Sequence, residues 1–287
     1  MPKRNRITIP YGDHAEQYAQ LSKPMHDNKL PVVIVIHGGY WKDNHDLNTY
    51  PTHSLVKYLE TLDVAVWNLE YRRMNFTGEN KSAPWPATFQ DVAQGIDFLK
   101  TIDELHHLNL EQILLIGHSA GGHLATWVGS RHVIPRSSEL YCPQPLTIQS
   151  IISIAGILNL RGYPDVEQPQ QILRLMGGTY ERFPERYHAC DPNLLPTSTI
   201  NLTIMHSEKD SCVTINQAKV YCQNSPACIQ TIYLAQGEHF SMLPFEGEWL
   251  MEQWTQLKQL VVQKIVSLTL PHKTCKTELP EIHRNLL

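Results

Sequence analysis

The sequence predicts an α/β fold in which helices cover both faces of a mostly parallel sheet. First, strand-like and helix-like segments alternate from Val32 onward, as they do in parallel sheets with helical crossovers. Second, the apolar runs 32–36 and 113–116 both end in glycine-rich turns, at the sheet edge where ligands bind in such folds. Third, 287 residues of ordinary hydrophobic content suit one large core. We expect a single domain over residues 1–268 and a tail over residues 269–287, to which the sequence assigns no role.

The individual elements follow from the apolar patterns. The expected strands are Gln17–Leu21, Val32–Ile36, Val64–Leu69, Ile113–Ile116, Ser150–Ile154, Leu202–His206 and Gln230–Leu234. The expected helices are His53–Thr61, Thr88–Ile102, Ser119–Ser130, Ile215–Gln223 and Gly247–Ser267, the last with an apolar stripe for core packing. Two polar or proline-rich segments, Met74–Pro84 and Leu158–Pro196, follow strands and are expected to form walls over the site, the second as a small lid.

A nucleophile elbow is predicted at residues 117–121, which read Gly-His-Ser-Ala-Gly. The pentapeptide alone is a weak signal, because glycine and serine are common. Here a buried strand precedes it and a small-residue helix follows it, which is the context that an elbow needs. The turn would hold the hydroxyl of Ser119 above the sheet as a nucleophile.

An oxyanion hole is predicted beside this serine. The run Val32–Ile36 ends in His37-Gly38-Gly39-Tyr40-Trp41. Glycines after a strand let backbone N–H groups approach a ligand, and such donors stabilise the anion that forms in acyl transfer. We assign the hole to the N–H groups of Gly39 and Ala120, with Gly38 or Tyr40 as a third donor; a simple tight turn is the structural alternative.

The base and its orienting acid are expected after later strands, in the chain order Ser, acid, His. Asp210 follows the strand that ends at His206, and His239 follows the strand that ends at Leu234. Glu208 competes with Asp210 for the acid role, since only one acid of that loop can reach the base. Glu238 precedes His239 directly and would favour the protonated imidazole if its carboxylate pointed inward.

Aromatic residues near these positions suggest a substrate pocket. Trp41, Trp85 and Phe240 would form its walls together with Tyr40, and His118 inside the elbow would line the floor. Core or loop packing is an equal alternative for each aromatic side chain. We also expect Arg72 and Asp91 to form an ion pair that belongs to the scaffold rather than to catalysis.

The motifs together resemble the α/β-hydrolase superfamily, and within it the esterase branch that includes hormone-sensitive lipase and kynurenine formamidase. The resemblance runs from about Gln17 to Leu250 and rests on residues 37–41, 70–73, 85–92, 117–123, 176–179, 184–187 and 206–213. It implies the α/β-hydrolase fold and the same Ser119, Asp210 and His239 triad. The chain departs from the family pattern at Ser207, Thr214 and Glu238, where Gly, Pro and Gly are usual.

Composition limits the partners. The net charge is −4, which gives no electrostatic case for nucleic acid, and no apolar stretch of signal-peptide or transmembrane length occurs. The six cysteines are scattered and read as free thiols, so we expect a cytoplasmic protein. No metal-binding motif is present and no cofactor is expected. The sequence leaves homodimerisation open.

The expected function is a serine hydrolase acting on a small carboxylic ester or an arylformamide such as N-formylkynurenine, through an acyl-enzyme. One alternative is a non-catalytic binding or receptor protein on the same fold, although such proteins usually lose a triad member. A peptidase is the other alternative, and the chain has no room for the propeller domain that often accompanies that activity.

Overall fold

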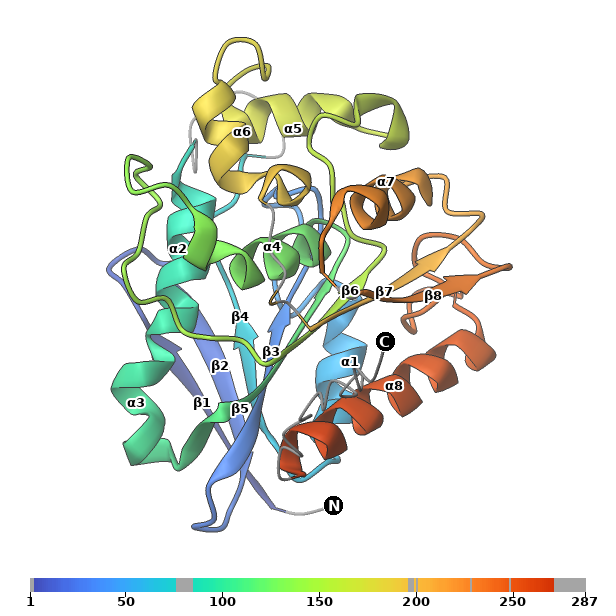
Figure 1. The fold of residues 1–287 in the computed structure, drawn as a ribbon. Helices are drawn as coiled ribbons and strands as arrows, with labels where there is room; N and C mark the ends of the chain where they lie inside the picture. Colours follow the sequence, from blue (N-terminus) through green and yellow to red (C-terminus); the bar gives the residue numbers. More distant parts are fainter. Residues whose placement is uncertain are drawn as a thin grey trace, which may run out of the picture.

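The centre of the molecule is a twisted sheet (Figure 1). The structure is a computed structural model and describes residues 3–75, 85–195, 199, 201–227, 229–247 and 249–270. Within these residues the sheet has eight strands in the order β1-β2-β4-β3-β5-β6-β7-β8. β1 and β2 pair antiparallel at one edge, β2 is also antiparallel to β4, and the strands from β4 to β8 are parallel to one another. The strands are β1 (Arg4–Pro10), β2 (Tyr18–Pro24), β3 (Leu30–Ile36), β4 (Ala65–Leu69), β5 (Leu108–His118), β6 (Ser150–Ile154), β7 (Leu202–Ser207) and β8 (Ile229–Leu234).

Helices cover both faces of this sheet, as the sequence predicts. α1 (Thr52–Leu59) and α8 (Met251–Thr269) pack with one set of strand side chains. The second core cluster joins the opposite face to α2 (Ala87–Asp97), α3 (Leu99–His106), α4 (Ala120–Gly129), α5 (Pro169–Met176), α6 (Pro184–Cys190) and α7 (Asn216–Asn224). Strands β3, β4 and β6 and the second half of β5 are almost wholly buried, which explains their continuous apolar runs. The predicted α/β fold is therefore confirmed.

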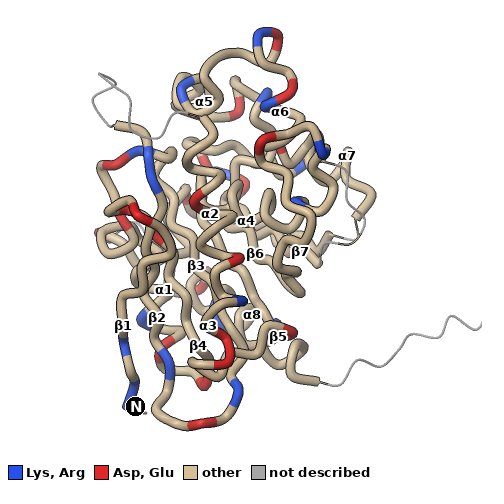
Figure 2. Tube along the Cα trace, turned by 90° about the vertical axis from the view of Figure 1, so that its left-hand side faces the viewer, with Lys and Arg blue, Asp and Glu red and all other residues tan. Residues whose placement is uncertain are grey.

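Two elements differ from the prediction. β1 was not expected, because it begins with three consecutive polar residues and four of its seven residues are exposed at the sheet edge. The predicted helix Thr88–Ile102 is divided at Phe98 into α2 and α3. No helix of the described residues is long and apolar enough to cross a bilayer. Acidic and basic residues are interspersed along the trace in Figure 2.

The structure describes most of one predicted wall and little of the other. The segment 158–195 folds into α5 and α6 with short 3₁₀ turns, and both helices sit beyond the carboxyl ends of the central strands (Figure 1). The other predicted wall, Met74–Pro84, falls mostly outside the described residues, as does the tail from residue 271 onward.

The predicted ion pair of Arg72 and Asp91 is confirmed. The Nη2 and Nε atoms of Arg72 each lie 2.7 Å from a carboxylate oxygen of Asp91, which is fully buried on α2. The backbone N–H of Arg72 (3.0 Å) and the Nε2 of Gln17 (2.7 Å) donate to the same carboxylate. Asp91 therefore ties the chain after β4, the turn before β2 and the start of α2 together.

We expect Asp91→Ala to lower the free energy of unfolding by about 3 kcal/mol or more. The substitution leaves the guanidinium of Arg72, its backbone N–H and the Nε2 of Gln17 without an acceptor. Urea unfolding followed by circular dichroism measures this. Lys29→Ala, which breaks the exposed pair between Lys29 and Glu104, is the control and should change stability little. Equal losses in the two variants would contradict a scaffold role for Asp91.

Candidate active site

Ser119 occupies a strained turn between β5 and α4. Its backbone has φ 56° and ψ −121°, a conformation that residues with a side chain rarely adopt. A Cβ atom on Gly117 would overlap the carbonyl oxygen of Gly121, and one on Gly121 would overlap that of Ile36. The two glycines therefore let strand and helix pass closely enough for the turn to form. The Ser119 N–H donates to the carbonyl of Ile154 (2.8 Å), which fixes the turn to β6.

A cavity of about 170 Å³ opens at this serine. Residues from five loops, those after β3, β5, β6, β7 and β8, meet there, so segments far apart in the sequence form one site. Its lining consists of Gly39, Tyr40, Lys42, Asn44, His45, Tyr50, Ser119, Glu167, Gln168, Cys212, His239 and Phe240. Glu167 and Gln168 come from the segment that the sequence predicts as a lid.

An acid–base pair reaches the cavity through His239, which lines it. The Nδ1 atom of His239 donates to the Oδ2 atom of Asp210 across 2.7 Å. The other oxygen of Asp210 accepts the backbone N–H groups of Cys212 (3.0 Å) and Val213 (2.8 Å), and the Nε2 of His206 lies 3.4 Å from Oδ2. Both members of the pair are about 5% exposed or less. Asp210 is thus fixed in place before any substrate binds.

The charge of Asp210 follows from these contacts. Burial alone would raise the pKa of this carboxyl, but the hydrogen bonds from His206 and His239 and the charge of His239 hold its pKa well below the usual range. Glu208, the competing acid, is exposed to solvent and does not line the cavity. The structure therefore brings Asp210, and not Glu208, to the predicted base.

The backbone after β3 turns sharply beside Ser119. Gly39 has φ 101°, Tyr40 φ 51° and Trp41 φ 56°, and the first two line the cavity. Ala120 is the first residue of α4, where helix N–H groups have no partner within the helix. The predicted oxyanion donors Gly39, Tyr40 and Ala120 therefore flank the serine. Gly38 packs against Tyr50 and the carbonyl of His118, since a Cβ there would overlap both.

The predicted pocket residues divide into two groups. Phe240 lines the cavity, and so does Tyr40. Trp41 is fully buried and packs edge-to-face on His123, with 5.3 Å between ring centroids. Trp85 lines a separate hollow with Glu139 and Arg186. His118 is fully buried and belongs to a hydrogen-bonded chain rather than to the cavity lining.

That chain runs from Tyr50 through His118 to His239. The Nε2 of His118 lies 3.0 Å from the backbone carbonyl of His239, and its Nδ1 lies 2.8 Å from the hydroxyl of Tyr50. A carbonyl only accepts, so Nε2 carries the proton. Burial lowers the pKa of His118 to about 3, so the ring is neutral and its Nδ1 accepts. Tyr50 must therefore donate to His118.

This geometry leaves the oxygen of Tyr50 as an acceptor next to Ser119. Burial raises the pKa of Tyr50, and a hydrogen bond from Ser119 opposes that rise. Tyr50 therefore contacts the nucleophile and lines the cavity, yet no sequence motif marks it. The sequence places it only in a polar turn, and the contact depends on how that turn folds back over the elbow.

The carboxylate of Glu238 is bound by Ser211. Its Oε2 accepts from the Oγ of Ser211 (3.1 Å) and from the backbone N–H of Ser211 (3.3 Å), in the loop after β7. Its side chain therefore links two surface loops beside the base. Within the described residues, no group of three or more His, Cys, Asp or Glu side chains could hold a metal ion.

We expect Glu238→Gln to leave the acidic limb of the kcat/KM profile where it is in the wild type, because the carboxylate faces Ser211. Steady-state rates from about pH 5 to 8, where imidazoles titrate, measure this. Ser211→Ala, which removes the partner hydroxyl, is the matched variant and should give the same profile. A limb displaced toward lower pH in Glu238→Gln alone would mean that the carboxylate acts on the imidazole.

The comparisons with known proteins agree with this architecture. A family model described as BD-FAE matches residues 20–224, more than half of the chain. No curated protein matches the sequence. The solved structures that resemble the chain include a bifunctional GH43-CE of Bacteroides eggerthii, with TM-score 0.72 and 18% identity over 91% of this chain and 38% of that longer one.

Two further solved structures match along nearly their whole length. A truncated carbohydrate esterase from gut microbiota has a TM-score of 0.70 and 18% identity over 92% of this chain and 96% of its own. Esterase 2 of Thermogutta terrifontis, phosphonylated by sarin, has a TM-score of 0.72 and 14% identity over 92% and 95%. The resemblance to the α/β-hydrolase superfamily is thereby confirmed. With the family match over residues 20–224, the fold and the elbow show that this chain belongs to the BD-FAE family and is an α/β hydrolase.

Proposed function

We propose that the protein is a serine hydrolase that cleaves a small carboxylic ester through an acyl-enzyme. The observation that carries the proposal is the meeting of Ser119, in its strained turn, with the Asp210–His239 pair at one cavity. The resemblance of the fold to solved esterases, one of them phosphonylated by sarin, supports it.

The hydrogen bonds define the direction of proton transfer. Because a carboxylate only accepts, Nδ1 of His239 carries a proton toward Asp210, and in the neutral ring Nε2 is left as the acceptor. Nε2 takes the proton of Ser119 as its Oγ attacks the substrate carbonyl, and Asp210 stabilises the imidazolium that forms. The same nitrogen then protonates the leaving group.

The developing oxyanion needs donors on the other side of the carbonyl carbon. We assign these donors to the N–H groups of Gly39, which lines the cavity, and of Ala120, which follows Ser119 at the start of α4, with Tyr40 as a further donor. Water then attacks the acyl-enzyme with His239 as the base, which restores the serine.

The cavity indicates the size of the acyl group. At about 170 Å³ it is smaller than most drug-sized ligand sites, and the rings of Tyr40 and Phe240 narrow it. Lys42 and Gln168 join across its rim, with Nζ 3.0 Å from Oε1. These features favour an ester with a short acyl chain. We expect the substrate to be a small molecule. The His-Gly-Gly-Tyr-Trp block resembles that of kynurenine formamidases, so an arylformamide is the second candidate substrate class.

A chain-length series tests the proposal. Purified protein is assayed with p-nitrophenyl acetate, butyrate and octanoate, and with N-formylkynurenine in parallel. We expect kcat/KM to fall from acetate to octanoate. Faster turnover of N-formylkynurenine than of every ester would move the substrate class to formamides. Covalent labelling of Ser119 by a fluorophosphonate without turnover of any of the four would favour a peptidase, and neither labelling nor turnover would favour a binding protein.

A further inference from the structure

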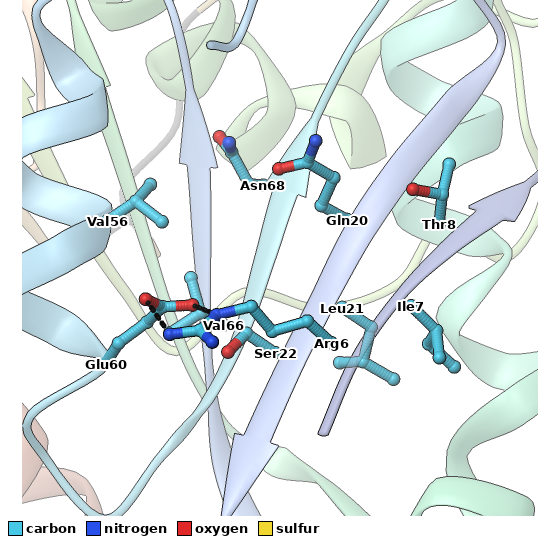
Figure 3. A pocket seen from close by; sticks show the side chains of 10 residues that line it. All are labelled: Arg6, Ile7, Thr8, Gln20, Leu21, Ser22, Val56, Glu60, Val66 and Asn68. Atoms are coloured by element: carbon cyan, nitrogen blue, oxygen red, sulfur yellow. Dashed lines mark hydrogen bonds and ion pairs between the residues drawn. The ribbon is translucent and has the colours of Figure 1, made fainter. Parts of the chain in front are cut away.

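A second groove lies on the face of the sheet that α1 covers (Figure 3). It has a volume of about 200 Å³ and shares no lining residue with the cavity at Ser119. The register of β1, β2 and β4 places Thr8, Gln20 and Asn68 in one row across three strands. The next row holds Arg6, Ser22 and Val66, while α1 supplies Val56 and the helix end supplies Glu60.

The side chain of Asn68 is the feature of this groove that suggests a bound ligand. Its side chain is 1% exposed, and neither its Nδ2 nor its Oδ1 has a hydrogen-bond partner among the described residues. Figure 3 shows its carboxamide directed into the groove together with that of Gln20. Buried amides are nearly always paired, because an unpaired one loses its hydration without compensation. Asn68 therefore presents one acceptor and one donor group to whatever occupies the groove.

The two charged side chains that line the groove are paired with each other. The Nε and Nη2 atoms of Arg6 lie 2.7 and 2.9 Å from the two carboxylate oxygens of Glu60, in a bidentate pair. Each charge is thereby neutralised by its partner. The remaining polar groups are neutral amides and hydroxyls, and Gln20 keeps its Oε1 available while its Nε2 donates to Asn48 (3.1 Å).

We propose that this groove binds one small neutral polyol, such as a single sugar ring, through the carboxamides of Asn68 and Gln20. Adjacent hydroxyls on a ring both donate and accept, so they match a carboxamide that offers both. Val56 and Val66 give the apolar C–H face of such a ring a surface to pack on. Its lining runs from exposed Thr8 on β1 to buried Asn68 on β4, which suits a ligand that enters from the sheet edge.

The test uses the full chain labelled with nitrogen-15 and titrated with methyl β-D-glucopyranoside. We expect amide shifts at residues of β1, β2 and β4 around the groove, with a Kd of about 1 mM, as a ligand of this size allows. Asn68→Leu should weaken binding at least about tenfold. Gln20→Leu, at a half-exposed position that folding tolerates more easily, should weaken it as well. Ser119→Ala should bind like the wild type.

A comparison with an anionic sugar sharpens the result. Methyl β-D-glucuronide, the anionic analogue, should bind no more tightly than the neutral sugar, because Arg6 is already paired. Shifts confined to the cavity at Ser119, an unchanged Kd in both amide variants, or no shifts at all would overturn the proposal and leave a water-filled groove. Tighter binding of the glucuronide would also overturn it, since the site would then select charge.

Discussion

Ser119→Ala should lower ester hydrolysis by a factor of about 10⁴ to 10⁶, because triad members act as a unit and only the contribution of the oxyanion hole and of substrate binding remains. Ser119 is the one hydroxyl held in the strained turn at the cavity, with its N–H fixed to Ile154. Rates are measured with p-nitrophenyl acetate. Circular dichroism should show the variant folded, since alanine adds no volume at this position.

A fluorophosphonate probe separates this loss from a general defect. The probe should label the wild type at Ser119 and fail to label Ser119→Ala, as found by peptide mapping. Ser211→Ala is the matched control, because Ser211 lies in the loop after β7 and is exposed. It should keep both labelling and turnover. Labelling at another serine, or undiminished turnover in Ser119→Ala, would remove the nucleophile role from Ser119.

Asp210→Asn should lower kcat/KM by about 10⁴, because an amide can bind Nδ1 of His239 in the wrong tautomer and carries no charge to stabilise the imidazolium. Glu208→Gln is the matched control and should keep most of the activity, since Glu208 is exposed and outside the cavity. The reverse pattern would give the acid role to Glu208.

The same variant has a consequence for stability against pH. The contacts of Asp210 hold its pKa below the unfolded value, so ionised Asp210 stabilises the fold fully above about pH 4 and loses this contribution as the pH falls further. The difference in unfolding free energy between wild type and Asp210→Asn should therefore shrink as the pH falls below about 4. A difference that stays constant there would mean that the pairing does not favour the ionised form.

The sequence predicts which candidate catalytic residues meet at one edge of the sheet better than it predicts the shape of the pocket. The strands around Ser119 are runs of buried β-branched and aliphatic residues, and the turns after them carry glycines, so both leave a local pattern. Asp210 and His239 follow from chain order, because parallel strands bring their carboxyl ends to one edge. None of this depends on side-chain packing.

The shape of the pocket depends on how side chains pack, and local sequence patterns do not predict that packing. Trp41 and Phe240 are both aromatic and both adjoin predicted site residues, yet one is buried in the core and the other lines the cavity. Tyr50 reaches Ser119 only because the turn before α1 folds over the elbow. β1 escaped prediction because edge strands carry polar residues that face water.

The order of the strands divides the molecule in a way that suits fragment complementation. β1 to β5 form one continuous part of the sheet and β6 to β8 form the other, so the join between β5 and β6 separates the first half of the chain from the second. Ser119 belongs to the first half, and Asp210 and His239 to the second. A chain cut at the exposed bond between Arg136 and Ser137 would therefore yield two pieces that are inert alone. Hydrolysis would return only when the two pieces meet, which would make the enzyme a reporter of association between proteins fused to them.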